Sequence, residues 1–310
     1  MGFSLCFFLF RKWRKGLQLA LRDLPSNKWK AVLCLAQIGL ALLALLIYSL
    51  NNVFYSFLTS IFVSQYHYAY SVTLTFAQVL LTLLLFLSLR FVGVAPQLSY
   101  SLQLGEQLLV PSVCESIQEI LALWAETSAP VALYHITLQL LPLACVAWSR
   151  VLKLTQPSSP HITVLLAAIT VTSVSITVSR GPLWVEPLVC VYAPLSLFLH
   201  SLSLCWMAKV GEDEVAHKGW WVSLLNLYFS LTVNKSLVLG VLCLVHPDGL
   251  RALTTGHWQT LLFLAYLLGV LLLGALQHLL LGMGALFGFP LAAALLHAAP
   301  ELVKPLMALL

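Results

Sequence analysis

Charged side chains are scarce in this chain of 310 residues: Asp, Glu, Lys and Arg make up 9% of it, whereas hydrophobic residues make up 60%. A soluble protein of this length needs a far more polar surface, so the composition excludes a soluble globular protein. Apolar runs long enough to cross a bilayer recur almost from end to end. We therefore predict a multi-pass membrane protein.

The sequence also lacks the short motifs that mark common enzymes. It contains no P-loop, no nucleotide-binding GxGxxG, no GxSxG and no zinc signature. Its seven cysteines form no CxxC pair, which argues against a disulfide framework or a zinc site. We expect no enzyme activity, no cofactor and no metal. We interpret the histidines inside apolar runs as packing or hydrogen-bonding residues; they are His135, His200, His278 and His297.

The apolar runs predict helices and not barrel strands, because they are continuously apolar and do not alternate every second residue. A bilayer needs about 20 apolar residues per helix, which predicts about nine spans. The loops between them are too short for a soluble domain. The fold class is therefore all-α, a polytopic bundle of membrane helices. The predicted spans are 31–57, 68–92, 106–125, 129–152, 161–179, 183–208, 219–245, 257–281 and 285–310.

Basic residues predict the orientation of the bundle. If the N-terminus is cytoplasmic, all of the 16 Lys and Arg residues lie on the cytoplasmic side except Arg180, Arg251, Lys235 and Lys304. This asymmetry is the positive-inside pattern. The net charge of +5 then reflects topology, and we expect no binding of nucleic acid. Residues 1–30, apolar and then basic, are predicted to lie as an amphipathic segment on the cytoplasmic membrane face, in contact with lipids.

Ionisable residues at membrane depth are costly, and each is therefore a candidate functional residue. Glu115 and Glu119 fall on one helical stripe of the third span. The functional interpretation is a helix that lines an aqueous cavity; the alternative is a helix whose glutamates pair with lysines of neighbouring helices. Lys235 and Lys304 lie in the seventh and ninth spans. Either lysine could hold a phosphate or neutralise a glutamate, and Glu301 is close enough in sequence to pair with Lys304.

Four stretches of the sequence resemble the nucleotide-sugar transporters of solute carrier family 35, within the drug/metabolite transporter superfamily, and most closely the branch that carries UDP-sugars. They are Tyr48-Ser49-Leu50-Asn51, Gly93-Val94-Ala95-Pro96, the stretch from Tyr134 through Pro142 to Lys153, and the stretch from Ala293 to Lys304. The resemblance covers about residues 45–310. It implies a family of ten helices in two inverted repeats; here 31–155 would form the first and 156–310 a second that is one helix short.

The resemblance implies antiport across a Golgi or endoplasmic-reticulum membrane, in which a nucleotide sugar is exchanged for a nucleoside monophosphate by alternating access. In the same way Lys304 would contact phosphate, Tyr134 would stack or donate a hydrogen bond, and Asn51 and Tyr228 would contact sugar or base. One departure concerns the family's Lys-Arg pair on the fourth helix, which here is replaced by Leu138 and Gln139.

Because phosphates in a cavity of low dielectric need compensating charge, this departure keeps other functions open. One is a non-transporting membrane protein of the same fold, with a regulatory, trafficking or assembly role. Another is an intramembrane enzyme that acts on lipid. A homodimer is also open.

Overall fold

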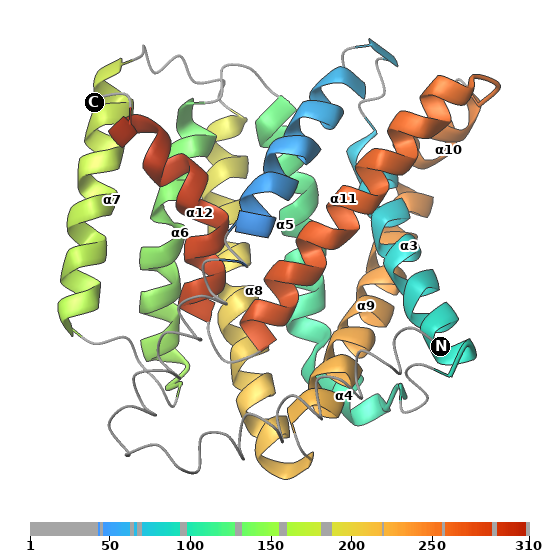
Figure 1. Ribbon diagram of the computed structural model, residues 1–310, viewed down its shortest axis with the longest axis horizontal. Coiled ribbons are helices and arrows are strands. Elements are labelled where there is room, and N and C mark those ends of the chain that lie inside the picture. Colours follow the sequence, from blue (N-terminus) through green and yellow to red (C-terminus); the bar gives the residue numbers. More distant parts are fainter. Residues whose placement is uncertain are drawn as a thin grey trace, which may run out of the picture.

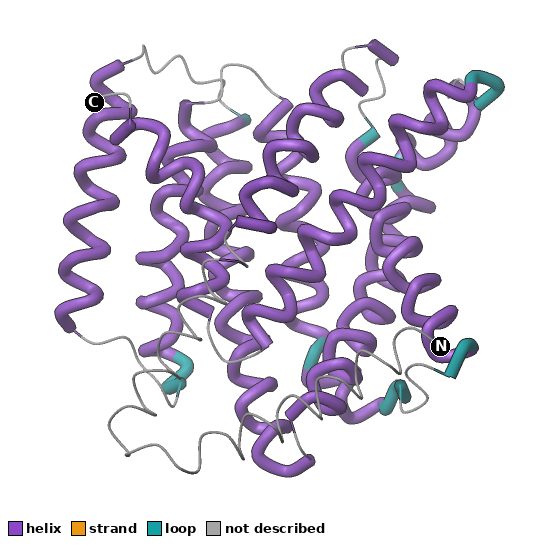
Figure 2. The backbone as a smooth tube through the Cα atoms, viewed as in Figure 1, coloured by secondary structure: helices purple, strands orange, loops and turns teal. Residues whose placement is uncertain are grey.

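The structure is a computed structural model that describes residues 43, 46–62, 65–66, 70–93, 98–127, 132–154, 160–180, 188–218, 220–255, 258–286 and 290–307. Within these ranges the regular elements are helices, and none of these residues forms a strand (Figures 1 and 2). The predicted segment 1–30 on the membrane surface lies outside the described residues, as do 31–42 and 44–45 of the predicted span 31–57 and 287–289 and 308–310 of the predicted span 285–310.

A long helix overlaps each predicted span, which confirms the all-helical bundle over the described residues, whereas the count of about nine membrane spans stays a prediction. A helix covers residues 46–62. The elements that follow are α3 (Ser71–Phe91), α4 (Leu102–Gln107), α5 (Leu109–Thr127), α6 (Ala132–Val151), α7 (Pro160–Arg180), α8 (Val189–Lys218), α9 (Trp220–Val245), α10 (Pro247–Thr255), α11 (Leu261–Leu286) and α12 (Pro290–Met307). The short helices α4 and α10 are not part of the prediction, and they lie at opposite ends of the bundle (Figure 1).

Local chemistry explains where several helices begin. Helices α7, α10 and α12 begin at Pro160, Pro247 and Pro290. Proline suits the first position of a helix because the amide hydrogen that it lacks has no partner there. Helix α4 is capped instead: the hydroxyl of Ser101 accepts a hydrogen bond from the amide of Leu104 at 3.3 Å.

The exterior of the bundle is apolar, unlike that of a soluble protein. Large apolar side chains point outward, for example Leu84 on α3, Val164 on α7 and Leu244 on α9, all more than half exposed. Polar groups such as Gln78 and Glu115 are buried. Of the described helices, α3, α7, α8, α9 and α11 are long and apolar enough to cross a bilayer. An apolar exterior over a polar interior is what lipid requires, so the chain is a multi-pass membrane protein.

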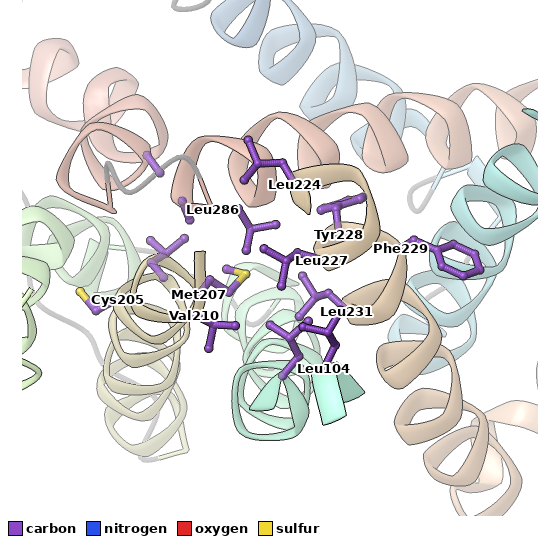
Figure 3. Close-up of a cluster of buried hydrophobic side chains, with 14 of the residues drawn as sticks. Leu104, Cys205, Met207, Val210, Leu224, Leu227, Tyr228, Phe229, Leu231 and Leu286 are labelled. Carbon is purple, nitrogen blue, oxygen red and sulfur yellow. The ribbon is translucent and has the colours of Figure 1, made fainter. Parts of the chain in front are cut away.

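A tightly packed apolar cluster joins α8, α9 and the end of α11 (Figure 3). Met207, Leu227 and Leu286 are almost completely buried in it. The close approach of α8 to α11 depends on Gly211, where an added Cβ would lie 2.3 Å from the carbonyl oxygen of Leu286. This cluster fixes α8, α9 and α11, three of the helices that carry the polar interior.

Candidate functional site

A cavity of about 140 Å³ lies inside the bundle. Its wall is built from helix 46–62 and from α3, α5, α6, α8, α11 and α12. We name it the central cavity. The glutamates and histidines in its wall are Glu115, Glu119, His135, His200, His278, His297 and Glu301. So many ionisable groups around one cavity at membrane depth mark it as the candidate functional site.

The first group of contacts is formed by Glu115, Glu119, Lys235 and His278, which we name the Glu–Lys–His cluster. Residues four apart lie on one face of a helix, so α5 presents both glutamates together. The ammonium of Lys235 on α9 donates to Oε1 of Glu119 at 2.5 Å and lies 3.4 Å from Oε1 of Glu115. Nδ1 of His278 on α11 lies 3.0 Å from the same oxygen of Glu119.

The burial of this cluster makes its charges interdependent. The side chains of Glu115, Glu119 and Lys235 are 7%, 6% and 5% exposed, and that of His278 is 24% exposed. A buried charge without a partner is strongly destabilising, so each carboxylate depends on the ammonium. Lys235 therefore neutralises the glutamates of α5 in this structure. This is one of the two roles that the sequence left open for Lys235, the other being contact with a phosphate.

A second group of contacts surrounds Glu301 on α12. Its carboxylate lies 2.9 Å from Nδ1 of His135 and 2.6 Å from the ammonium of Lys304. Its backbone carbonyl has no helical partner because position 305, four residues on, is a proline without an amide hydrogen. The side chain of Gln139 donates to that carbonyl instead, at 2.9 Å. The proline thus creates an acceptor on α12, and α6 supplies its donor.

A third group links helix 46–62 to the cavity wall. The hydroxyl of Tyr48 lies 2.6 Å from Nδ1 of His297 and accepts a hydrogen bond from the side chain of Gln277 at 3.1 Å. The rings of His297 and His200 are 5.1 Å apart, edge to face. Neither ring nitrogen of His200 has a hydrogen-bond partner, and Nε2 of His297 has none. Buried nitrogens of this kind are candidates for contact with a bound molecule.

The structure places the residues that the resemblance singled out in different environments. Tyr134 lies in the wall of the central cavity. Tyr228 lines a smaller pocket beside it, together with Lys235. The amide of Asn51 faces α11 and donates to the carbonyl of Leu273 at 3.0 Å. Lys304 is not in the wall, and its side chain is 66% exposed. These residues are therefore not brought together around one ligand-sized space.

The four histidines that the sequence predicts to be packing or hydrogen-bonding residues lie in the wall of the central cavity, and all but His200 have the polar contacts described above: His135, His200, His278 and His297. They come from four different helices, and no short motif connects them. The signal that could have found them is their ionisable character at membrane depth, which applies to each of them separately. Their convergence follows only from the packing of α6, α8, α11 and α12.

The cavity offers mainly acceptor atoms. Oε2 of Glu115, Oε2 of Glu119 and Oε1 of Gln277 are buried and have no hydrogen-bond partner. The wall carries three carboxylates; Lys235 pairs with those of Glu115 and Glu119, and Lys304 pairs with that of Glu301. Such an arrangement suits a cation or a donor of hydrogen bonds and disfavours an anion.

Comparison with known proteins leaves the chain without an assigned family. No family model matches it, and no curated protein matches it either. The resemblance to nucleotide-sugar transporters therefore stays a prediction from the sequence motifs. The chain is a multi-pass helical membrane protein, and its interior cavity is lined by glutamates and histidines.

Proposed function

We propose that this protein is a transporter that moves a small polar solute across a membrane by alternating access. The observation that carries the proposal is the central cavity, a polar space lined by ionisable groups inside an apolar exterior. Ionisable residues inside a membrane are costly, and they typically mark substrate or ion pathways. The absence of recognisable enzyme motifs also favours transport over an intramembrane enzyme.

The pairing of helices supports two inverted repeats. A shift by five spans relates helix 46–62 to α8, α3 to α9, α5 to α11 and α6 to α12. Because successive spans alternate in direction and the shift is odd, related helices run in opposite directions. Under this relation the pairs α3–α9 and α6–α12 are each related to themselves. The pair α5–α9 is related to the pair α11–α3. All four pairs are in contact, as the relation requires. In transporters of this design the substrate binds between the repeats, near the membrane midplane.

Contacts of the first helix agree with the same relation. Helix 46–62 meets α11 where Asn51 donates to Leu273, and the related pair α8 and α5 also packs together. It meets α12 where Tyr48 contacts His297, and the related pair α8 and α6 is likewise in contact. These pairings support repeats over 31–155 and 156–310.

Size and charge of the cavity favour a small substrate. A volume of about 140 Å³ is well below the roughly 300–1,000 Å³ that pockets for drug-sized ligands occupy. The three carboxylates pair with two ammonium groups, those of Lys235 and Lys304, so no free ammonium of the described residues faces the cavity and a neutral or cationic solute is favoured over an anion. We therefore propose a small polar or cationic substrate, with Glu115 and Glu119 as the groups that hold it.

A nucleotide sugar is the second candidate substrate, and the sequence resemblance is what favours it. This proposal includes exchange for a nucleoside monophosphate in the Golgi or endoplasmic-reticulum membrane. The cavity would have to widen around Tyr134 and draw in Lys304 and Lys235. Both lysines pair with glutamates here, and position 139 holds a glutamine that binds α12, so the phosphates would need another source of positive charge.

Uptake into liposomes tests both candidates. The purified full-length chain is reconstituted and offered small organic cations, divalent metal ions, neutral polyols and a panel of nucleotide sugars, each labelled. We expect uptake of a small polar or cationic solute that falls about ten- to a hundredfold in Glu119→Gln, since a hydrogen bond to a charged group is worth about 1.5–3 kcal/mol. Glu106→Gln, an exposed glutamate on α4, is the matched control and should transport normally.

The alternatives give different results. Uptake of nucleotide sugars that is lost in Lys304→Ala would favour the second candidate. A protein that is folded in the liposomes but takes up nothing from the panel would contradict transport, and it would favour the regulatory, trafficking or assembly role of a non-transporting protein.

A further inference from the structure

The Glu–Lys–His cluster contains a set of potential metal ligands. One carboxylate oxygen from Glu115, one from Glu119 and one ring nitrogen of His278 all lie within 4.8 Å of one another. The ligands come from two helices of the cavity wall, α5 and α11. Two carboxylates and an imidazole are a ligand set typical of Zn²⁺, Mn²⁺ or Fe²⁺.

Unpartnered atoms next to these ligands point to a missing occupant. Glu115 and Glu119 are more than nine-tenths buried, yet Oε2 of each has no hydrogen-bond partner. His200, also more than nine-tenths buried, lies in the wall of the same cavity with both ring nitrogens unpartnered. Buried polar atoms are nearly always satisfied in folded proteins. Orphaned carboxylate oxygens and ring nitrogens that share one cavity are therefore a second, independent indication of a bound cation.

The position of Lys235 shows how a cation is accommodated there. Its ammonium lies against Oε1 of both Glu115 and Glu119, where a metal ion bound by the two carboxylates would sit. A lysine is a cation on a flexible stem, so it can neutralise the glutamates while the site is empty and withdraw when another cation enters. The site would then never hold two uncompensated carboxylates.

We propose that Glu115, Glu119 and His278 bind a divalent transition-metal ion, which displaces the ammonium of Lys235 from the carboxylates. The inference deepens the proposed transport function by naming the substrate class of the central cavity, and it rests on that function for its physiological meaning. Binding itself does not depend on transport. His200 lines the same cavity from α8 but is not one of the three ligands that converge.

Metal binding is measured by titration calorimetry on the full-length chain in detergent, purified without a polyhistidine tag. The probes are Zn²⁺, Mn²⁺ and Mg²⁺. We expect binding of about one Zn²⁺ or Mn²⁺ per chain and much weaker binding of Mg²⁺, which prefers oxygen ligands alone and retains its waters. Binding should weaken at least about tenfold in Glu119→Gln and in His278→Asn. It should be unchanged in the matched controls Glu106→Gln and His161→Asn, which alter exposed residues.

The Lys235→Met variant separates a built site from adventitious binding. If the ammonium competes with the metal, this variant should bind Zn²⁺ more tightly than the wild type, and Zn²⁺ should raise its thermal stability by more than that of the wild type. His278→Cys should restore Zn²⁺ binding that His278→Asn lacks, because a thiolate is also a zinc ligand. This variant alters His278, the most exposed member of the cluster, and leaves the ion pairs between Lys235 and the two glutamates in place.

Two results would overturn the inference. One is a wild type that binds no Zn²⁺ or Mn²⁺ beyond the level of the two control variants. The other is binding that survives in both Glu119→Gln and His278→Asn, because the ion would then lie elsewhere. A protein that binds the metal at this cluster but transports no solute would contradict the proposed function and leave the inference intact. A protein that transports another solute without binding metal would contradict the inference and leave the proposed function intact.

Discussion

At the scale of single residues, Lys235 is the ammonium that neutralises two buried glutamates. Lys235→Met leaves two buried glutamates without their ammonium. Removing one partner of a buried ion pair costs about 3–5 kcal/mol, because the remaining charge has neither water nor counter-charge. We expect the metal-free variant to lose about this much stability, measured by thermal or denaturant unfolding in detergent.

The matched control is Lys209→Met. Lys209 pairs with Asp213 at 3.5 Å on the same helix, and their side chains are 37% and 67% exposed. Exposed pairs contribute about 0–1 kcal/mol, so this variant should unfold much like the wild type. Adding Glu119→Gln to Lys235→Met should recover part of the loss. Equal stability of the two lysine variants would show that the buried pairs do not carry the charge balance described here.

Sequence reasoning reached some of these residues and missed others for a physical reason. The stripe of Glu115 and Glu119 could be predicted because residues four apart share a helix face whatever the helix packs against. The partner of Lys235 could not be predicted, because Lys235 and Glu119 are 116 positions apart in the sequence. His200 and His297 meet only because α8 and α12 converge on one cavity, and no local pattern records that convergence.

At the scale of elements, glycines set how closely helices approach. Gly211→Ala should destabilise the protein, because the new Cβ would lie 2.3 Å from the backbone carbonyl of Leu286, and a backbone atom cannot rotate away. Overpacking of this kind costs about 1–3 kcal/mol. Thermal unfolding in detergent measures the effect.

Gly240→Ala is the control for this prediction. Gly240 lies inside α9, and an added Cβ there would meet the ring of Phe76 at 3.5 Å, an ordinary contact. Alanine is the better helix former, so this variant should be as stable as the wild type or slightly more stable. A Gly211→Ala variant that is equally stable would contradict the close packing of α8 on α11.

The prolines of α12 give a second prediction at this scale. Gln139→Leu removes the donor to the carbonyl of Glu301, which Pro305 leaves without a helical partner. An unsatisfied buried acceptor costs about 1–3 kcal/mol. Adding Pro305→Ala supplies a backbone amide at the right position, so the double variant should recover stability that Gln139→Leu has lost. Strictly additive effects in this double-mutant cycle would contradict the link between α6 and α12.

Long helices were easier to predict than the short ones. The apolar runs placed a helix in every predicted span because a bilayer demands length and apolarity, and both can be counted along the chain. Helices α4 and α10 are too short for that signal and depend on local features, the hydroxyl of Ser101 and the proline at 247. The contacts between helices could not be predicted, because they join residues far apart in the sequence and no local pattern records which helices meet.

At the scale of the whole molecule, the remaining question is which side of the membrane each end of the bundle faces. Helices α4 and α10 lie at opposite ends (Figure 1). The spans alternate in direction, so the C-terminal end of α6, with Arg150, lies at the same end as α4. The basic residues predict that this end is cytoplasmic and that Arg251 on α10 faces the opposite side.

Labelling of single cysteines tests this orientation. Arg150 and Arg251 are both exposed, so each can be replaced by cysteine in a variant whose seven native cysteines are changed to alanine or serine. In sealed vesicles with the cytoplasmic face outward, a membrane-impermeant maleimide should label Arg150→Cys at once and Arg251→Cys only after detergent opens the vesicles. The cysteine-free parent should stay unlabelled in both states. The reverse pattern would place the N-terminus outside the cytoplasm and would contradict the positive-inside interpretation, whereas the fold and the central cavity would stand unchanged.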